Sequence, residues 1–216
     1  MILRLDPASP DNGLLRKTAG IIAGSGVVVF PTETVYGLGA DLRNTDAIRH
    51  VFRIKDRPED QPLMLHCSKE SQLAGIVAEI SEPARLLIRI FWPGPLALVF
   101  KAKPGLPDLI TGPNNTTGIR MVTHPVACAL ISQLGSPLAG TSANLHAEPP
   151  TGDFSALNPE LLDRVDVALD VGVCGKGTAS TVLDVSCSPP VLLREGAVRK
   201  QAIERLLGLS LAAPNS

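Results

Sequence analysis

Apolar positions along the chain follow two different spacings. Short runs rich in β-branched residues, such as residues 27–30, have the composition of strands buried on both faces, whereas longer stretches repeat apolar residues at the spacing of amphipathic helices. Helices are predicted over residues 14–22, 47–52, 82–91, 125–134 and 200–207. Strands are predicted over residues 27–30, 63–66, 96–101, 118–122, 138–142, 165–171, 181–185 and 191–194. This mixture of strands and helices predicts an α/β fold.

The composition is that of a globular chain with an aliphatic core. The 216 residues are 44% hydrophobic and 19% charged but only 3% aromatic, so Val, Leu, Ile and Ala must fill most of the core. No internal repeat, low-complexity tract or linker composition divides the sequence. We therefore expect one domain over residues 1–216, with its core at about residues 10–208 and a frayed tail from residue 209.

Charge and cysteine content narrow the function classes. A net charge of −1 gives no overall field for nucleic acid, so any anion must be held by local Arg and Lys side chains. Cys67, Cys128, Cys174 and Cys187 lack the spacing of a zinc site and are expected to be free, buried thiols. The absence of a signal-peptide pattern, and of an apolar run near the roughly 20 residues of a membrane span, predicts a soluble cytoplasmic protein with no membrane contact.

Three short polar segments are candidates for ligand binding. Residues 30–39, FPTETVYGLG, follow an apolar strand and combine hydroxyls, a carboxylate, the only tyrosine and two glycines. Residues 140–144, GTSAN, follow another strand with small residues that let a nucleotide lie close. Lys55 and Arg57 present a point charge and a planar fork suited to a polyphosphate. The alternatives are ordinary polar turns for the two loops, and a complement to the helix dipole for Lys55 and Arg57.

Single cationic side chains also end several predicted strands. Arg120 and Arg194, if buried, need an anionic partner, which is either a protein carboxylate such as Glu195 or a ligand. His66 ends another apolar strand, where a structural role is more common than a catalytic one. The sequence lacks the GxGxxG, GxxxxGK[ST], GxSxG and HExxH motifs. Taken alone, the residues indicate only an anionic small molecule bound at strand ends.

In their order along the chain, these segments resemble the YrdC/Sua5 family of threonylcarbamoyl-AMP synthases. The resemblance rests on FPTETVYGLGAD, IKDRP before PLMLH, WPGPLALVF, GIRMVTHP, PLAGTSAN, STVLDV and LLREGAV, which cover nearly the whole chain. It implies the short, single-domain form of the family: a twisted mixed sheet of the YrdC/RibB-like type with a concave basic cavity. The implied activity is that of a nucleotidyltransferase, which converts ATP, L-threonine and bicarbonate to threonylcarbamoyl-AMP and pyrophosphate, for N6-threonylcarbamoyladenosine formation in tRNA.

The same resemblance implies two sets of binding residues. The residues implied for ATP are Lys55, Arg57, Gln61, Thr116, Ser142, Asn144, Pro150 and Arg194, with Lys55 and Arg57 also implied in catalysis. The residues implied for threonine are Thr34, His66, Arg120, Gly140 and Ser180, with Thr32 and Tyr36 beside them. Mg²⁺ is expected to arrive with the nucleotide rather than at a protein metal site. The product is expected to pass to a tRNA threonylcarbamoyl transferase complex, with at most a weak tRNA contact.

One departure from the family and two alternative functions qualify this interpretation. Where the family commonly has a Ser-Gly pair, residues 145–148 read LHAE, so this loop is expected to differ in shape and to alter the contact assigned to Pro150. An RNA-binding module of the same fold is one alternative, although only two pairs of basic residues, Arg16-Lys17 and Arg199-Lys200, are directly adjacent in the sequence. A carbamoyl-transfer paralogue, like part of the hydrogenase-maturation carbamoyltransferases, is the other, although the cysteine pairs of those proteins are missing from this sequence.

Overall fold

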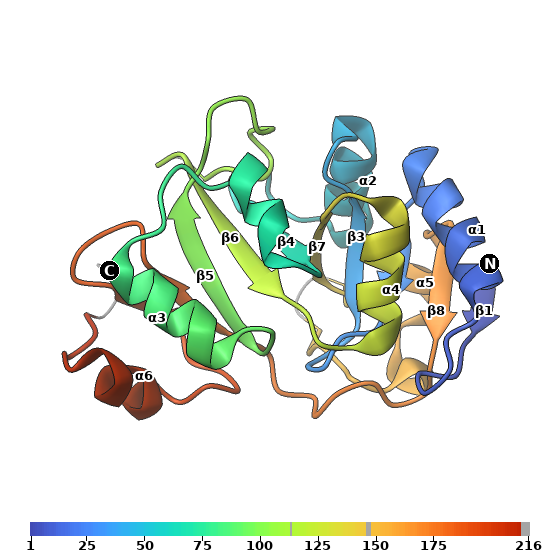
Figure 1. Ribbon diagram of the computed structural model, residues 1–216. Helices are drawn as coiled ribbons and strands as arrows, with labels where there is room; N and C mark the ends of the chain where they lie inside the picture. The colour runs from blue at the N-terminus through green and yellow to red at the C-terminus, as the bar shows by residue number, and fades with distance from the viewer. Residues whose placement is uncertain (113, 146–147, 213–216) are drawn as a thin grey trace.

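A computed structural model describes residues 1–112, 114–145 and 148–212 (Figure 1). Ten strands form one twisted, open sheet, and they are β1 Ile2–Arg4, β2 Val28–Phe30, β3 Gly37–Asp41, β4 Met64–Cys67, β5 Leu96–Lys101, β6 Thr116–Met121, β7 Leu138–Ser142, β8 Val167–Asp170, β9 Thr181–Asp184 and β10 Val191–Arg194. Their order across the sheet is β1-β8-β2-β3-β7-β4-β6-β5-β9-β10. Parallel pairs such as β4 and β6 and antiparallel pairs such as β3 and β7 both occur. The predicted fold class, a mixed α/β sheet in one domain, is confirmed.

Six α-helices flank this sheet. They are α1 Asn12–Ala23, α2 Thr45–Lys55, α3 Glu82–Phe91, α4 Pro125–Leu134, α5 Pro159–Asp163 and α6 Lys200–Leu207, and short 3-10 turns lie at Glu70–Gly75 and Phe154–Ala156. Local chemistry fixes several ends: the Asp11 carboxylate accepts hydrogen bonds from the first turn of α1, and α4 ends at Gly135, whose φ of 70° suits glycine. No helix in the described part of the chain is long and apolar enough to cross a membrane.

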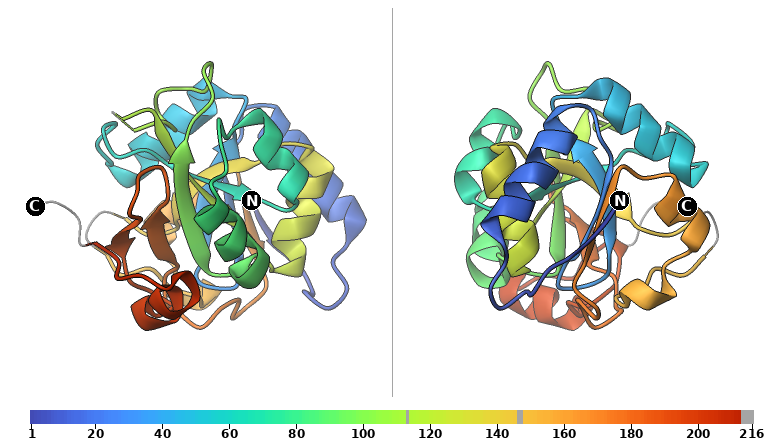
Figure 2. Two further views of the ribbon diagram at one scale, coloured as in Figure 1. Left: turned by 60° about the vertical axis from the view of Figure 1, so that its left-hand side comes forward. Right: turned by 90° about the vertical axis from the view of Figure 1, so that its right-hand side faces the viewer.

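Two hydrophobic clusters hold helices and sheet together. Figure 2 shows α1 and α4 lying side by side, and Leu15 and Ile22 of α1 meet Val126 and Leu130 of α4 over Phe30 of β2. A larger cluster joins α2, α3, α5 and α6 to the other strands. Both clusters consist mainly of Val, Leu, Ile and Ala, as the composition predicts.

The predicted helices and strands are all present, but three further elements are not predicted: β1, α5 and β3. Strand β3 begins at Gly37, within residues 30–39, the segment interpreted as a loop, so only the part of that segment between Phe30 and Gly37 is a loop. A Cβ at Gly37 would lie 2.6 Å from the Phe30 ring, and one at Gly39 would lie 2.9 Å from the Ala139 carbonyl oxygen. This strand therefore depends on close contact between neighbouring backbones rather than on β-branched residues.

Two smaller predictions are also corrected. Residues 209–212 are not frayed, because Leu211 is buried and Ala212 pairs with Val191. The four cysteines are free thiols, but only Cys67 is buried, and Cys187 is exposed.

Candidate functional site

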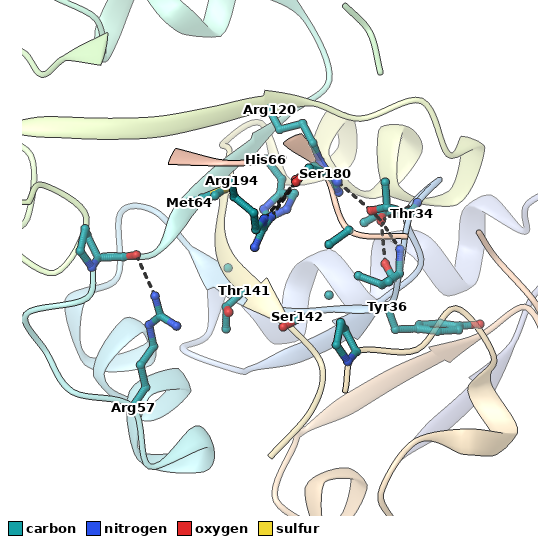
Figure 3. Close-up of a pocket in the computed structure, with 17 residues that line it drawn as sticks. Thr34, Tyr36, Arg57, Met64, His66, Arg120, Thr141, Ser142, Ser180 and Arg194 are labelled. Atoms are coloured by element: carbon teal, nitrogen blue, oxygen red, sulfur yellow. Dashed lines mark hydrogen bonds between the residues drawn. The ribbon is translucent and has the colours of Figure 1, made fainter. Parts of the chain in front are cut away.

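Strand ends and loops from the middle of the sheet and from its β9–β10 edge surround one cavity of about 200 Å³ (Figure 3). The predicted site residues that line it are Thr32, Thr34, Tyr36, Arg57, His66, Arg120, Gly140, Ser142, Pro150, Ser180 and Arg194. Lys55, Gln61, Thr116 and Asn144 are not among the residues that line it. Residues far apart in the sequence thus meet in one cavity, as expected if a ligand binds where several strands end.

The charge of this lining is one-sided. The guanidinium groups of Arg57, Arg120 and Arg194 border the cavity, and no Asp or Glu is among the residues that line it. Burial lowers the pKa of each of these arginines, which means that their charge is poorly solvated. An anionic ligand would compensate all three charges at once.

A chain of hydrogen bonds fixes Arg120 at one end of the cavity. Arg120, only 4% exposed, donates from Nη1 to the Thr34 hydroxyl at 2.7 Å (Figure 3). Thr32 donates its hydroxyl proton to the Val35 carbonyl oxygen at 2.6 Å, so the Thr34 hydroxyl must be the donor in its 2.9 Å bond with Thr32. The Thr34 oxygen consequently keeps one lone pair for a ligand donor.

His66 borders the same end as a neutral ring. Burial, and then the positive charge of Arg120, lowers the pKa of His66 to about 3. Its Nδ1 atom has no hydrogen-bond partner among the described residues. A Cβ added at Gly140 would lie 3.5 Å from this nitrogen, so the glycine leaves the space in front of it open. An unpaired nitrogen of this kind is suited to bind a donor from a small ligand.

Lys55 serves the turn after β7 rather than the cavity. Its Nζ atom donates to the Ser142 carbonyl oxygen at 2.7 Å, the Asn144 carbonyl oxygen at 2.7 Å and Asn144 Oδ1 at 2.9 Å. Burial, and then the charge of Arg57, lowers the pKa of Lys55 to about 8. The Asn144 amide donates to the Leu145 and Glu148 carbonyl oxygens. Lys55 and Asn144 therefore hold the Ser142 hydroxyl in place from behind.

Other predicted residues also contribute through the backbone. The Tyr36 hydroxyl points away from the cavity in Figure 3 and donates to the Gly172 carbonyl oxygen at 2.9 Å, so it anchors the turn after β8. Burial raises the pKa of Tyr36 above its ordinary value. Gln61 supplies a carbonyl oxygen to Arg57 Nε at 2.8 Å, and Thr116 supplies one to the Gly112 amide at 2.8 Å.

Arg194 is not paired with Glu195, the protein carboxylate proposed from sequence. Arg194 donates from Nε and Nη2 to the Ser180 carbonyl oxygen at 3.1 and 2.9 Å, whereas Glu195 accepts from the Lys200 amide. The carboxylate nearest to Arg120 that forms an ion pair is Glu33, which the sequence analysis did not single out.

Several cavity residues were not predicted, and some follow from strand alternation. Met64 lies two positions before His66 and so shares its strand face, which is a usable signal, whereas Thr141 lies between Gly140 and Ser142, where alternation alone predicts the opposite face. Val35, Gly37, Pro62 and Ala179 also line the cavity. Of the loop at residues 145–148, residues 146 and 147 lie outside the described part of the chain. The ends of this loop are joined, because the Glu148 carboxylate accepts from the Leu145 amide at 3.0 Å.

Comparison with known proteins identifies the family of this chain and several of its relatives. A family model described as "Telomere recombination", for Sua5, YciO and YrdC proteins, matches residues 20–196. The threonylcarbamoyl-AMP synthase of Bacillus subtilis is 40% identical over 204 residues, which are 94% of this chain and 59% of that protein. A putative threonylcarbamoyl-AMP synthase of Mycobacterium tuberculosis is 36% identical over 96% of this chain and 95% of its own length.

A solved structure shares the fold closely. The crystal structure of Pyrococcus abyssi Sua5 complexed with L-threonine superimposes with a TM-score of 0.94 at 35% identity, covering 99% of this chain and 62% of that one. The chain therefore spans less than two thirds of the Bacillus and Pyrococcus proteins, but nearly the whole length of the mycobacterial protein.

Proposed function

Because the chain belongs to the Sua5/YciO/YrdC family, we propose that its cavity binds ATP and L-threonine and produces threonylcarbamoyl-AMP from them and bicarbonate. The family assignment made from the ordered motifs is confirmed by the family model. The observation that carries the proposal is the convergence of three arginines on a cavity whose lining residues include no carboxylate. A nucleoside triphosphate and an amino acid carboxylate together supply the anionic groups that such a cavity needs.

The amino acid binds at the Arg120 end. The guanidinium of Arg120 faces the carboxylate of threonine, where a planar fork matches two oxygens. Thr34 and the neutral His66 ring each keep an acceptor free for the amine and hydroxyl of threonine. The Pyrococcus structure was solved with L-threonine, which supports this assignment. Thr32, Gly140 and Ser180 border the same end, and Tyr36 supports it through its backbone and ring.

The nucleotide binds toward Arg57 and Arg194. These two side chains neutralise phosphate charge, and the Ser142 oxygen, whose proton is donated to Asn144 Oδ1, accepts a hydrogen bond from a ribose hydroxyl. Lys55 and Asn144 act on the nucleotide by holding Ser142. Pro150 borders the ATP end, and Gln61 and Thr116 shape it from outside the lining.

The reaction has two bond-forming steps. The neutral amine of threonine attacks the carbon of bicarbonate and water leaves, giving a carbamate. A carbamate oxygen then attacks the α-phosphorus of ATP, the bond from that phosphorus to the bridging oxygen breaks, and pyrophosphate leaves with the electron pair. The protein contributes by alignment of these groups and by neutralisation of phosphate charge.

Magnesium enters as part of the nucleotide substrate. Within the described residues, no group of three or more His, Cys, Asp or Glu side chains is arranged to hold a metal ion. The cavity lining offers hydroxyls and guanidinium groups, which do not form the oxygen-rich set that Mg²⁺ prefers. Mg²⁺ therefore arrives bound to the phosphates of ATP.

The wider setting follows from the activity. We expect a cytoplasmic protein whose residues 1–216 form one domain with a core at about residues 10–208, and whose labile product passes to a tRNA threonylcarbamoyl transferase complex. The names of the relatives favour this synthase over an RNA-binding module of the same fold. The net charge of −1 also leaves little attraction for RNA beyond a weak contact with tRNA.

Product formation in a defined mixture tests the proposal. The protein is incubated with ATP, L-threonine and bicarbonate, while pyrophosphate is measured and the adenylate is identified by mass spectrometry. Both should appear only when all three substrates are present. Arg57→Ala should reduce their formation by about 100-fold, whereas Arg53→Ala, an exposed arginine on the last turn of α2, should not. Salt-sensitive RNA binding without turnover would instead support the alternative.

A further inference from the structure

Thr34 lines two cavities. The cavity described above is bordered by Thr34 and Arg120, and a second cavity of about 450 Å³ is bordered by Thr34 and Glu33. Arg120 is not among the residues that line the second cavity, and Glu33 is not among those that line the first. Glu33 therefore contacts Arg120 without lining the cavity proposed for the substrate.

The contacts of Glu33 fix its carboxylate at this place. Glu33 Oε2 accepts a hydrogen bond from the Thr123 backbone amide at 3.1 Å, and Glu33 Oε1 lies 3.8 Å from Arg120 Nε. The Arg120 and Glu33 side chains are 5% and 17% exposed. Neither Glu33 Oε1 nor Arg120 Nε has a hydrogen-bond partner among the described residues. The carboxylate is anchored to the backbone on one oxygen and faces the guanidinium with the other.

We propose that Glu33 is the positioning residue for Arg120: it holds the Nε edge of the guanidinium, so that the remaining edge faces the carboxylate of the amino acid substrate. This inference rests on the proposed function. Arg120 Nη1 is already engaged by Thr34, so the Thr34 and Glu33 contacts together define the plane of the guanidinium. With that plane fixed, the guanidinium presents its two-donor fork to the ligand without further loss of conformational freedom.

The effect of Glu33 on the pKa of Arg120 is consistent with this positioning role. Burial lowers the pKa of Arg120, Glu33 opposes that effect, and the nearby charge of Arg194 adds to it. In the absence of substrate, Glu33 is thus the group that keeps the Arg120 charge in its buried position. Loss of this partner leaves the Arg120 charge uncompensated and lowers stability, so the positioning role is separated from a purely structural one by a selective effect on threonine binding.

Removal of the Glu33 charge has two opposite consequences for threonine. If Glu33 only weakened the positive field, Glu33→Gln would tighten the binding of any carboxylate. If Glu33 positions Arg120, the same variant would weaken threonine binding, because the guanidinium loses the partner that fixes its plane. The sign of the change in threonine affinity therefore shows whether Glu33 only weakens the positive field at the site or positions Arg120.

Calorimetric titration of the full chain with L-threonine, and separately with ATP, measures that sign. We expect Glu33→Gln to weaken threonine binding by about tenfold or more and to leave ATP binding within about twofold, with some loss in melting temperature because the buried Arg120 charge loses its partner. Glu33→Asp keeps the charge on a shorter side chain and should recover part of the affinity. Glu82→Gln, which removes an exposed carboxylate on α3, is the matched control and should change none of these values.

Each other outcome overturns a defined claim. Tighter or unchanged threonine binding in Glu33→Gln, or equal losses for threonine and ATP together with a lower melting temperature, overturns the role of Glu33 alone. An unmodified protein that binds ATP but not threonine overturns the proposed function, and the inference built on it.

Discussion

Substitution of Lys55 by Met removes the ammonium group that holds the turn after β7, with little change in side-chain volume. Three charge-assisted hydrogen bonds, at 2.7, 2.7 and 2.9 Å, are lost together. Each is worth about 1.5–3 kcal/mol, but the cost of burying the charge offsets part of the sum. We expect Lys55→Met to lower the free energy of unfolding by about 2–4 kcal/mol.

The effect on function follows from displacement of the turn. The Ser142 hydroxyl shares Asn144 Oδ1 with Lys55, at 2.5 Å from the hydroxyl oxygen. A shift of Ser142 by about 1 Å would reduce kcat/KM for ATP by about 100-fold. Denaturant unfolding, calorimetric titration with a non-hydrolysable ATP analogue, and pyrophosphate release measure the three consequences. Lys103→Met is the control, because Lys103 also donates to a backbone carbonyl oxygen, at 2.6 Å, but at the surface.

Two results would refute this reasoning. Loss of nucleotide affinity with an unchanged free energy of unfolding would mean that Lys55 contacts phosphate directly. Full activity in a destabilised variant would mean that the turn does not set the nucleotide site. The pH dependence gives a further check: because the pKa of Lys55 is lowered to about 8, nucleotide affinity should weaken as pH rises through 8 in the unmodified protein, but not in Lys55→Met.

Two further predictions concern stability. In the folded protein the pKa of His66 is about 3, whereas in the unfolded chain this ring is protonated near the ordinary value of 6.5. The free energy of unfolding should therefore fall by about 1.4 kcal/mol per pH unit below 6.5. Denaturant unfolding at a series of pH values measures this slope, which should be smaller for His66→Gln. Gly140→Ala should lower the melting temperature markedly, because the added Cβ would lie 2.7 Å from the Leu38 carbonyl oxygen on the neighbouring strand; a melting temperature within about 2 °C of the unmodified protein would contradict this packing.

Local patterns in the sequence account for most of the fold. Helix α4 begins at Pro125 and ends before Gly135, and both residues mark the helix ends through the backbone conformation that they favour locally. Strand β3 escaped prediction because its cause is not local. Gly37 and Gly39 are needed where the Phe30 ring and a neighbouring strand leave no space for a Cβ, and that requirement exists only once the sheet has formed.

The site, like the fold, was only partly predictable from local sequence patterns. Motif positions predicted which residues gather around the cavity, but not which way each polar group points. Lys55 is bonded to a turn 87 and 89 residues further along the chain, so its direction depends on how α2 and β7 pack. Glu33 adjoins Thr34 in the sequence, yet it contacts Arg120 without lining the cavity that Thr34 and Arg120 line. The spacing of residues along one strand predicts which of them share a face, but contacts between different strands and helices can be read only from the folded structure.

Among the described residues, the placement of the polar groups leaves no free base beside the amine of the proposed substrate, threonine. Lys55 is bonded to the turn after β7, Tyr36 is bonded to the backbone, and Glu33 does not line the cavity. His66 borders the cavity, but a pKa of about 3 makes it a poor acceptor of a proton from an ammonium group. The arginines of the cavity instead disfavour the ammonium form and lower the pKa of a bound amine. In the proposed reaction, the cavity would thus select the neutral nucleophile by its charge, and the proton would be lost to solvent as threonine binds.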